Sequence, residues 1–99
     1  TLFAPTDEAF GALLGELGIS AGELLADPGL SSILLYHVLD TRQGAFQLLL
    51  ARSVETLQGD DLRIRLQRLG VYVNSSRVIN PNINAPNGVI HTIDKVLLP

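Results

Sequence analysis

The sequence contains no cysteine, no methionine and no tryptophan. The absence of cysteine excludes disulfides, thiolate catalysis and cysteine-based zinc sites. It leaves the cellular compartment open, because disulfide-free domains occur both inside and outside cells. Aromatic residues are also few, with two tyrosines and three phenylalanines. A hydrophobic core must therefore consist mainly of leucine, isoleucine and valine.

Long apolar runs are missing as well. No stretch approaches the roughly 18 residues of a membrane span, so the sequence predicts no transmembrane segment. The chain has 99 residues, of which 46% are hydrophobic and 17% are charged. A chain of this length and composition is typical of one globular domain and not of a disordered segment.

Positive charge is absent from the first forty residues. This part carries six carboxylates and no lysine or arginine, whereas residues 41–99 carry seven basic and four acidic side chains. One interpretation is two solvated faces of opposite sign, and another is attraction between the two halves, within one molecule or between copies. No basic stripe alternates with aromatic residues, so we expect no binding of nucleic acid.

Hydrophobic periodicity predicts a strand over residues 1–4, followed by helices. Thr6 is placed to cap the first helix, Asp7 falls in its first turn, and Gly18 is placed to end it. The segment Ser20–Glu23 has the pattern of a capping box, which predicts the start of a second helix. A third helix is expected to end near residue 35.

The second half of the chain changes to strand periodicity. A short helix is expected over residues 45–51, with Phe46 and either Leu49 or Leu50 facing inward. From Ser53 onward the apolar period is 2, and residues 61–68 alternate cleanly. Turns are expected at 69–70, 75–76 and 87–88, and residues 81–86 are predicted to form a loop or an irregular edge strand. One strand, then helices, then antiparallel strands indicates an α+β fold.

Three segments together resemble the signatures of one family. Residues 1–10, TLFAPTDEAF, are similar to the first signature of the fasciclin-like adhesion domain. The run Tyr36-His37-Val38 resembles the central Tyr-His motif of that family. Residues 87–99, NGVIHTIDKVLLP, resemble its second signature. The segments stand in the family order and span the whole chain.

The resemblance implies two small antiparallel or mixed β-sheets, packed as a wedge or sandwich, with short helices along one edge. It also implies a module for adhesion and protein binding without catalysis or cofactor. Such a module is expected outside the cell, at the cell surface or in the periplasm, where it binds a protein or a glycan. The motif Tyr36-His37 is a candidate contact for the partner.

Two departures from the family pattern affect these expectations. Family members normally carry helical sequence before the first signature, so residues 1–99 are expected to be one domain truncated at its N-terminus. An uncovered apolar helical face would then favour a homodimer, or a small apolar ligand such as a lipid as the alternative function. Integrin-binding members carry an Asp-Ile pair where this chain has Asn82-Ile83. A neutral amide cannot act as the carboxylate that completes a cation site.

The two histidines, His37 and His91, both lie in apolar surroundings. We interpret them as buried, neutral rings that bond to backbone groups or to a hydroxyl such as that of Thr6. Thr6 and Asp7 complete this set of structural polar residues. His91 is expected to hold the last strand against the first helix. No carboxylate stands at ligand spacing beside either histidine, so neither a metal site nor acid–base chemistry is expected.

Two further surface features have alternative interpretations. Arg63 and Arg65 lie on the outer face of one predicted strand, where they either protect it from edge pairing or bind an anionic ligand such as a sulfated glycan or an acidic protein. The triplet Asn74-Ser75-Ser76 matches the glycosylation sequon on a predicted turn. The partner-contact candidates are therefore Tyr36, His37, Arg63, Arg65, Asn82 and Ile83.

Overall fold

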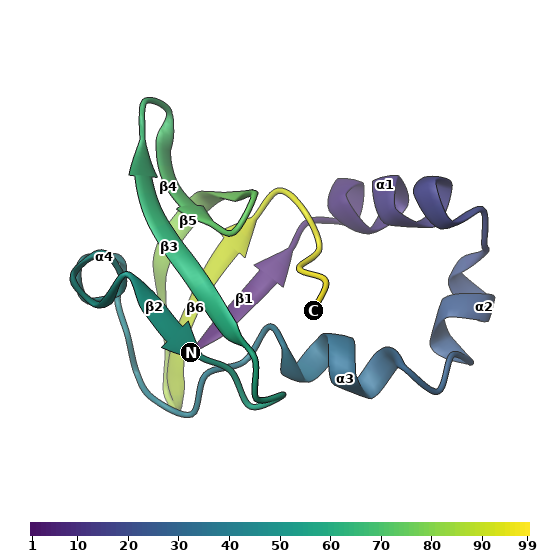
Figure 1. The fold of residues 1–99 in the computed structure, drawn as a ribbon, viewed down its shortest axis with the longest axis horizontal. Coiled ribbons are helices and arrows are strands. Elements are labelled where there is room, and N and C mark those ends of the chain that lie inside the picture. The colour runs from purple at the N-terminus through teal and green to yellow at the C-terminus, as the bar shows by residue number, and fades with distance from the viewer.

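Six strands form one mixed sheet in the order β1-β6-β5-β4-β3-β2 (Figure 1). The structure is a computed structural model that describes residues 1–99. The strands are β1 (Leu2–Pro5), β2 (Ser53–Glu55), β3 (Asp61–Gln67), β4 (Gly70–Val73), β5 (Ser76–Ala85) and β6 (Gly88–Ile93). The helices are α1 (Asp7–Leu17), α2 (Ala21–Leu25), α3 (Leu30–Leu35) and α4 (Ala45–Ala51). The predicted α+β class is confirmed.

The first and last segments of the chain pair with each other. Strands β1 and β6 are parallel, and Phe3 stands opposite His91. The other strand pairs are antiparallel. The two sequence signatures thus lie side by side in the sheet, which explains why the strand in each of them is largely apolar.

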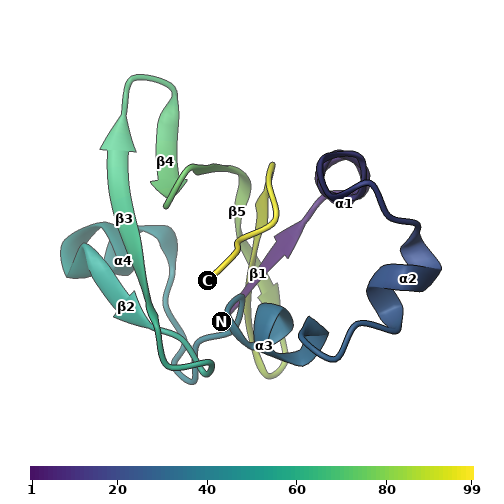
Figure 2. The same ribbon diagram turned by 45° about the vertical axis from the view of Figure 1, so that its right-hand side comes forward.

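The structure does not show the expected pair of small sheets, because the hydrogen-bonded order is continuous. Strand β5 is the reason. It pairs with β4 through Ser76 and Arg77 only, and it pairs with β6 from Val78 to Ala85. Register shifts interrupt the second pairing, and irregularities of this kind bend a strand. The sheet therefore curves at β5 instead of dividing there (Figure 2).

One hydrophobic cluster fills the curve of the sheet. It comprises eleven buried residues, nine of them aliphatic as the composition predicts. They are Phe3, Tyr36, Leu39, Leu48, Val54, Leu62, Ile64, Val73, Val78, Ile93 and Leu97. None of them comes from α1, α2 or α3. The core therefore belongs to the sheet, to α4, to the segment between α3 and α4, and to the C-terminal tail.

Helices α1 to α3 extend away from the sheet as an arm, defined here as residues 7–35 (Figures 1 and 2). Their predicted caps are confirmed: the Thr6 hydroxyl accepts from the Ala9 N–H at 3.1 Å, Gly18 is left-handed with φ 67°, and Ser20 with Glu23 forms the capping box. Local signals thus define where these helices begin and end, although the arm contributes little to the core.

Each of the three expected hairpin turns begins one residue earlier than predicted. The pairs Gln67↔Gly70, Val73↔Ser76 and Ala85↔Gly88 flank the two-residue loops. Gly70 and Gly88 are therefore the first strand residues after their turns, a position that glycine favours.

The four helices are also too short or too polar for any of them to span a membrane.

Candidate functional site

His37 joins the end of the arm to the C-terminal tail. Its ring is 3% exposed, and its Nε2 accepts a hydrogen bond from the Leu97 N–H at 2.9 Å. Because that amide can only donate, the ring proton sits on Nδ1, which donates to the Ile33 carbonyl at 2.7 Å. Burial lowers the pKa of His37, although the bond to Ile33 opposes this effect. The ring is therefore a neutral bridge between α3 and residue 97.

His91 forms a second neutral bridge with the opposite tautomer. Its Nδ1 accepts from the Asn82 N–H at 3.1 Å, so Nε2 carries the proton and donates to the Gln43 carbonyl at 2.8 Å. The ring is fully buried and stacks on Phe3 with centroids 5.7 Å apart. Burial lowers the pKa of His91, the bond to Gln43 opposes this, and the nearby N-terminal amine lowers it further.

The position of His91 corrects one expectation. The hydrogen bonds of the ring link β6 to β5 and to the loop before α4, and neither of them reaches the first helix. The Thr6 hydroxyl does not bond to either histidine, because it caps α1 instead. Asp7 is exposed in the first turn of that helix. Both ring nitrogens of each histidine are occupied by backbone groups, and no group of three or more metal-binding side chains occurs in the structure.

Tyr36 is buried and its hydroxyl supports the β4–β5 turn through hydrogen bonds. Its hydroxyl donates to the Asp61 carbonyl at 3.1 Å and accepts from the Asn74 side-chain amide at 3.0 Å. Tyr36 is 5% exposed. A partner could reach Tyr36 or His37 only after the fold opens locally, and contact through this pair stays a prediction.

Asn74 is held at every polar group. It has φ 54°, its side-chain oxygen accepts from the Arg63 N–H at 2.9 Å, and its side-chain nitrogen is bound to Tyr36. The third sequon residue, Ser76, is buried and donates its hydroxyl proton to the Lys95 carbonyl. A glycan on the Asn74 nitrogen would displace the bond to Tyr36, so the folded turn is a poor glycosylation site.

Asn82 caps α4 from a distant part of the chain. Its side-chain oxygen accepts from the Ala45 N–H at 2.9 Å, and the local cap position, Gly44, has no side chain to do so. A Cβ on Gly44 would lie 3.0 Å from that oxygen. Asn82 itself has φ 59°, a conformation that asparagine tolerates better than most residues. The neighbouring Ile83 is 42% exposed.

Helix α4 shows a different face to solvent than expected. Phe46 and Leu50 are 70% and 68% exposed, whereas Leu48 is fully buried. The prediction that Phe46 faces inward was wrong, whereas Leu49, one of the two leucines expected to face inward, does pack against the core. Phe46 and Leu50 share one face at i, i+4 spacing, and Leu48 lies on the other. A run of three leucines does not itself determine which face packs on a sheet.

A groove of about 470 Å³ lies between α4 and β3. Leu49, Ile64 and Leu66 supply its apolar lining, and Arg52 and Arg65 supply its charge. Arg65 also donates to the Asn74 carbonyl at 2.8 Å, which restricts its position. Arg52 follows α4 in a left-handed conformation with φ 64°.

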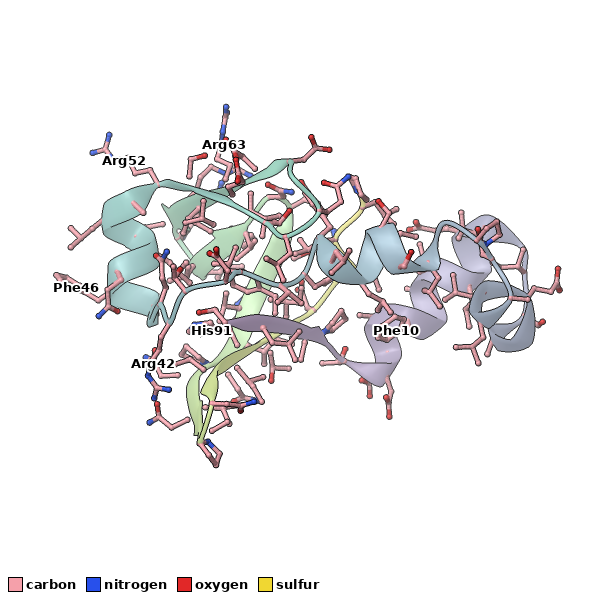
Figure 3. All side chains as sticks on the ribbon, turned by 90° about the horizontal axis from the view of Figure 1, so that it is seen from below. Phe10, Arg42, Phe46, Arg52, Arg63 and His91 are labelled. Carbon is pink, nitrogen blue, oxygen red and sulfur yellow. The ribbon has the colours of Figure 1, made fainter.

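We use the name α4 face for the exposed side of helix α4 together with residues of the adjoining groove. It consists of Phe46, Leu50, Arg52, Arg65 and Leu66, with Arg63 beside it and Asn82-Ile83 near the start of the helix. Phe46 and Arg52 project from the end of the molecule that carries α4, Arg63 projects upward from the neighbouring strands, and Phe10 lies on the arm away from all three (Figure 3). Of the predicted contact residues, Arg63 and Arg65 thus lie near the end of α4, and Asn82 and Ile83 lie near its start. Tyr36 and His37 lie in the interior.

Comparison with known proteins adds independent information. The family model for the fasciclin domain matches residues 1–99. The chain is 40% identical over 101 residues to protein sll1483 of Synechocystis, an alignment that covers 100% of this chain and 54% of that protein. It is 39% identical over 101 residues to human periostin, covering 100% of this chain and 12% of periostin.

A mycobacterial relative is also similar. The chain is 33% identical over 100 residues to the cell surface glycolipoprotein MPB83 of Mycobacterium bovis, covering 100% of this chain and 43% of that protein. The chain therefore spans about half the length, or less, of these relatives.

Proposed function

The chain belongs to the fasciclin domain family, and on that premise we propose that it is a non-enzymatic adhesion module that binds a protein partner through the α4 face. The setting is the extracellular matrix, the cell surface or the bacterial periplasm, as the family resemblance implies. The printed name of one relative, MPB83, places that protein at the cell surface.

The observation that carries this proposal is the combination of apolar and cationic side chains on the α4 face. Phe46, Leu50 and Leu66 are each about 70% exposed. Aromatic residues and arginine are enriched at protein interfaces, where a large side chain enters a pocket and guanidinium groups pair with carboxylates. The adjoining groove between α4 and β3 offers such a pocket. The chemistry fits a partner that presents an apolar side chain among acidic ones.

A cation-dependent contact through Asn82 receives no support. Its side-chain oxygen already caps α4, and a neutral amide supplies no charge to a divalent cation. Binding should therefore persist when divalent cations are chelated.

A lipid-carrier role also fits less well. Each of the three main hollows has two charged side chains in its lining: Glu16 and Lys95, Asp40 and Arg42, or Arg52 and Arg65. A site for an apolar ligand would be lined mainly by apolar groups, with a few polar groups that fix orientation.

The test compares variants on an immobilised chain exposed to matrix or envelope extracts. We expect Phe46→Ser with Leu50→Ser to abolish specific capture, and Leu57→Ser to leave it unchanged, because Leu57 is 49% exposed but lies outside the α4 face. Circular dichroism verifies that all variants are folded. Capture that is equal for both variants would contradict the proposal.

A second arm of the same experiment separates a protein partner from a glycan. Competition by a sulfated polysaccharide that is lost with increasing salt, together with no effect of the Phe46 and Leu50 changes, would indicate a glycan bound by Arg52, Arg63 and Arg65. Chelation with EDTA should have no effect in either case.

A further inference from the structure

The arm and the α4 face carry opposite charges. The arm has five carboxylates, all exposed, and no basic residue: Asp7, Glu8, Glu16, Glu23 and Asp27. Helix α4 has no acidic residue, and three exposed arginines, Arg52, Arg63 and Arg65, lie beside it. The adjoining strands β2 and β3 also expose two carboxylates, Glu55 and Asp61, so cationic side chains outnumber acidic ones here by three to two. An excess of charge of one sign at each end of a molecule steers encounter between unlike ends.

Both ends also expose apolar side chains next to their charges. On the arm, Leu25 is 75% exposed between Glu23 and Asp27, and Leu17 is 51% exposed next to Glu16. Leu34 and Leu35 on α3 are 49% and 42% exposed. On the α4 face, by comparison, Leu50 stands beside Arg52 and Leu66 beside Arg65. Both surfaces therefore combine exposed apolar side chains with charged ones, and the sign of the charge differs between them.

These two surfaces cannot meet within one molecule. The domain measures 37 Å along its longest axis, and α4 lies at one end of that axis while α1 and α2 lie at the other (Figure 1). Helix α4 is in contact with β2 and β3, on the side of the sheet that is remote from the arm. Any contact between the surfaces must involve a second copy.

We propose that copies of this domain associate head to tail, with the acidic, leucine-bearing arm of one copy seated on the α4 face of the next. The inference rests on the proposed function, because it names an occupant for the same face. An interface between two different patches is heterologous, and when its rotation does not close it extends into an open chain. The product is therefore a series of oligomers and not a closed dimer.

Sedimentation velocity of the 99-residue chain tests the association. We expect the mean sedimentation coefficient to rise with protein concentration, and the apparent association constant to fall about tenfold or more between 50 mM and 500 mM salt. A single monomeric species at every concentration would overturn the inference. In that outcome the capture experiment still decides whether the α4 face binds a foreign protein, so the two failures are distinguishable.

A mixing experiment tests the geometry. The face variant is Phe46→Ser with Leu50→Ser, and the arm variant is Leu17→Ser with Leu25→Ser. All four side chains are at least half exposed, so both variants should remain folded, and circular dichroism verifies this. Each variant alone keeps only one of the two surfaces and should be monomeric. Mixed together, they should form a 1:1 dimer that grows no further, because the two intact surfaces are then occupied.

Two outcomes would overturn the geometry. Self-association of the face variant alone would mean that arms pair with arms, and self-association of the arm variant alone would mean that α4 faces pair with each other. A mixture that stays monomeric would show that the two surfaces do not bind. The Leu57→Ser chain, whose change lies outside both surfaces, should associate like the unaltered chain.

Discussion

The sheet region and the arm are built on different principles. The sheet, α4 and the tail contribute nine of the eleven residues of the core cluster, and the segment after α3 contributes Tyr36 and Leu39, whereas the arm buries only Ala9, Leu13 and Leu24. The arm is instead defined by local capping bonds. Regions with few buried apolar contacts open at lower free energy than the core around them. The domain therefore combines a well-packed sheet region with an arm whose helix boundaries are set by local capping bonds. Few buried contacts hold this arm to the rest of the domain.

The arm is attached to the scaffold near its two ends. At the beginning, the Thr6 N–H donates to the Ile93 carbonyl at 3.1 Å. At the end, His37 connects Ile33 to Leu97, and the Phe3 N–H donates to the His37 carbonyl at 2.8 Å. These two attachments place the arm, so the difference between the regions can be tested by changing the core, the arm or an attachment.

The largest effect is expected from a core truncation matched with an arm truncation. Leu62 is fully buried, so Leu62→Ala should lower the free energy of unfolding by about 2–5 kcal/mol. Leu25 is 75% exposed, so Leu25→Ala should change it by less than about 0.5 kcal/mol. Urea denaturation of the two variants measures both values at a concentration where the chain is monomeric. Similar losses at both positions would mean that the arm shares the core after all.

A smaller effect is expected at the His37 attachment. His37→Ala leaves the buried Leu97 N–H and the Ile33 carbonyl without a partner, which should cost about 2–3 kcal/mol. Hydrogen exchange should accelerate most in α3. His37→Asn should lose less, because its amide can still donate to Ile33. Unchanged stability with lost partner binding would instead make His37 a contact residue.

Acidification should weaken the same attachments. Burial lowers the pKa of His37 and His91 in the folded state, and histidine in the unfolded chain has a pKa of about 6.5. Below pH 6.5 the unfolded chain binds more protons than the folded chain. The free energy of unfolding therefore decreases as the pH is lowered from 6.5 to the folded-state pKa values, and it levels off below them. Each unit of lowering contributes about 1.4 kcal/mol.

Denaturation at several pH values between 7.5 and 5 measures this dependence. The slope below pH 6.5 should decrease in the His37→Asn chain, because one of the two titrating rings is gone. Stability that is constant over this range would show that protonation does not disturb the two bridges. Protection factors of the arm amides, which correct for the intrinsic pH dependence of exchange, should be lower at pH 5 than at pH 7.5 if the His37 bridge holds the arm.

Much of this architecture follows from local chemistry. The caps at Thr6, Gly18 and Ser20 and the alternation of β3 lie within a few residues of the structure they specify, so the sequence predicts them. The turns were displaced by one residue because Gly70 and Gly88 follow the loop instead of forming it. Burial of both histidines was predicted, but their partners were not, since Leu97 and Gln43 are 60 and 48 residues away.

The α4 face could not be predicted for the same reason. Which side of α4 packs inward depends on the curved sheet that receives Leu48, and no local pattern in residues 45–51 reports that curvature. The distant cap by Asn82 is equally invisible along the chain, because 37 residues separate it from Ala45. Candidate residues were named individually, and only the three-dimensional structure shows which of them share a surface.

The smallest effect is expected at Asn82, where the scaffold meets the α4 face. Asn82→Ala removes the cap of α4 and places alanine at φ 59°, so it should cost about 1–2 kcal/mol. Asn82→Asp keeps an oxygen acceptor at the same helix terminus, where a negative charge is favourable, so its stability should stay within about 0.5 kcal/mol of the original. Urea denaturation of both variants gives the comparison.

The same pair of variants distinguishes a structural role of Asn82 from a role in partner binding. Asn82→Asp creates the Asp-Ile pair that the family resemblance associates with integrin binding, and it keeps the cap, whereas Asn82→Ala loses the cap without adding charge. If the α4 face binds through Phe46 and Leu50, neither change should make binding sensitive to EDTA, and the alanine variant should weaken it only as far as α4 frays. EDTA-sensitive binding by the aspartate variant alone would show that this scaffold can support a cation-dependent contact, and that the neutral side chain of Asn82 prevents it in this chain.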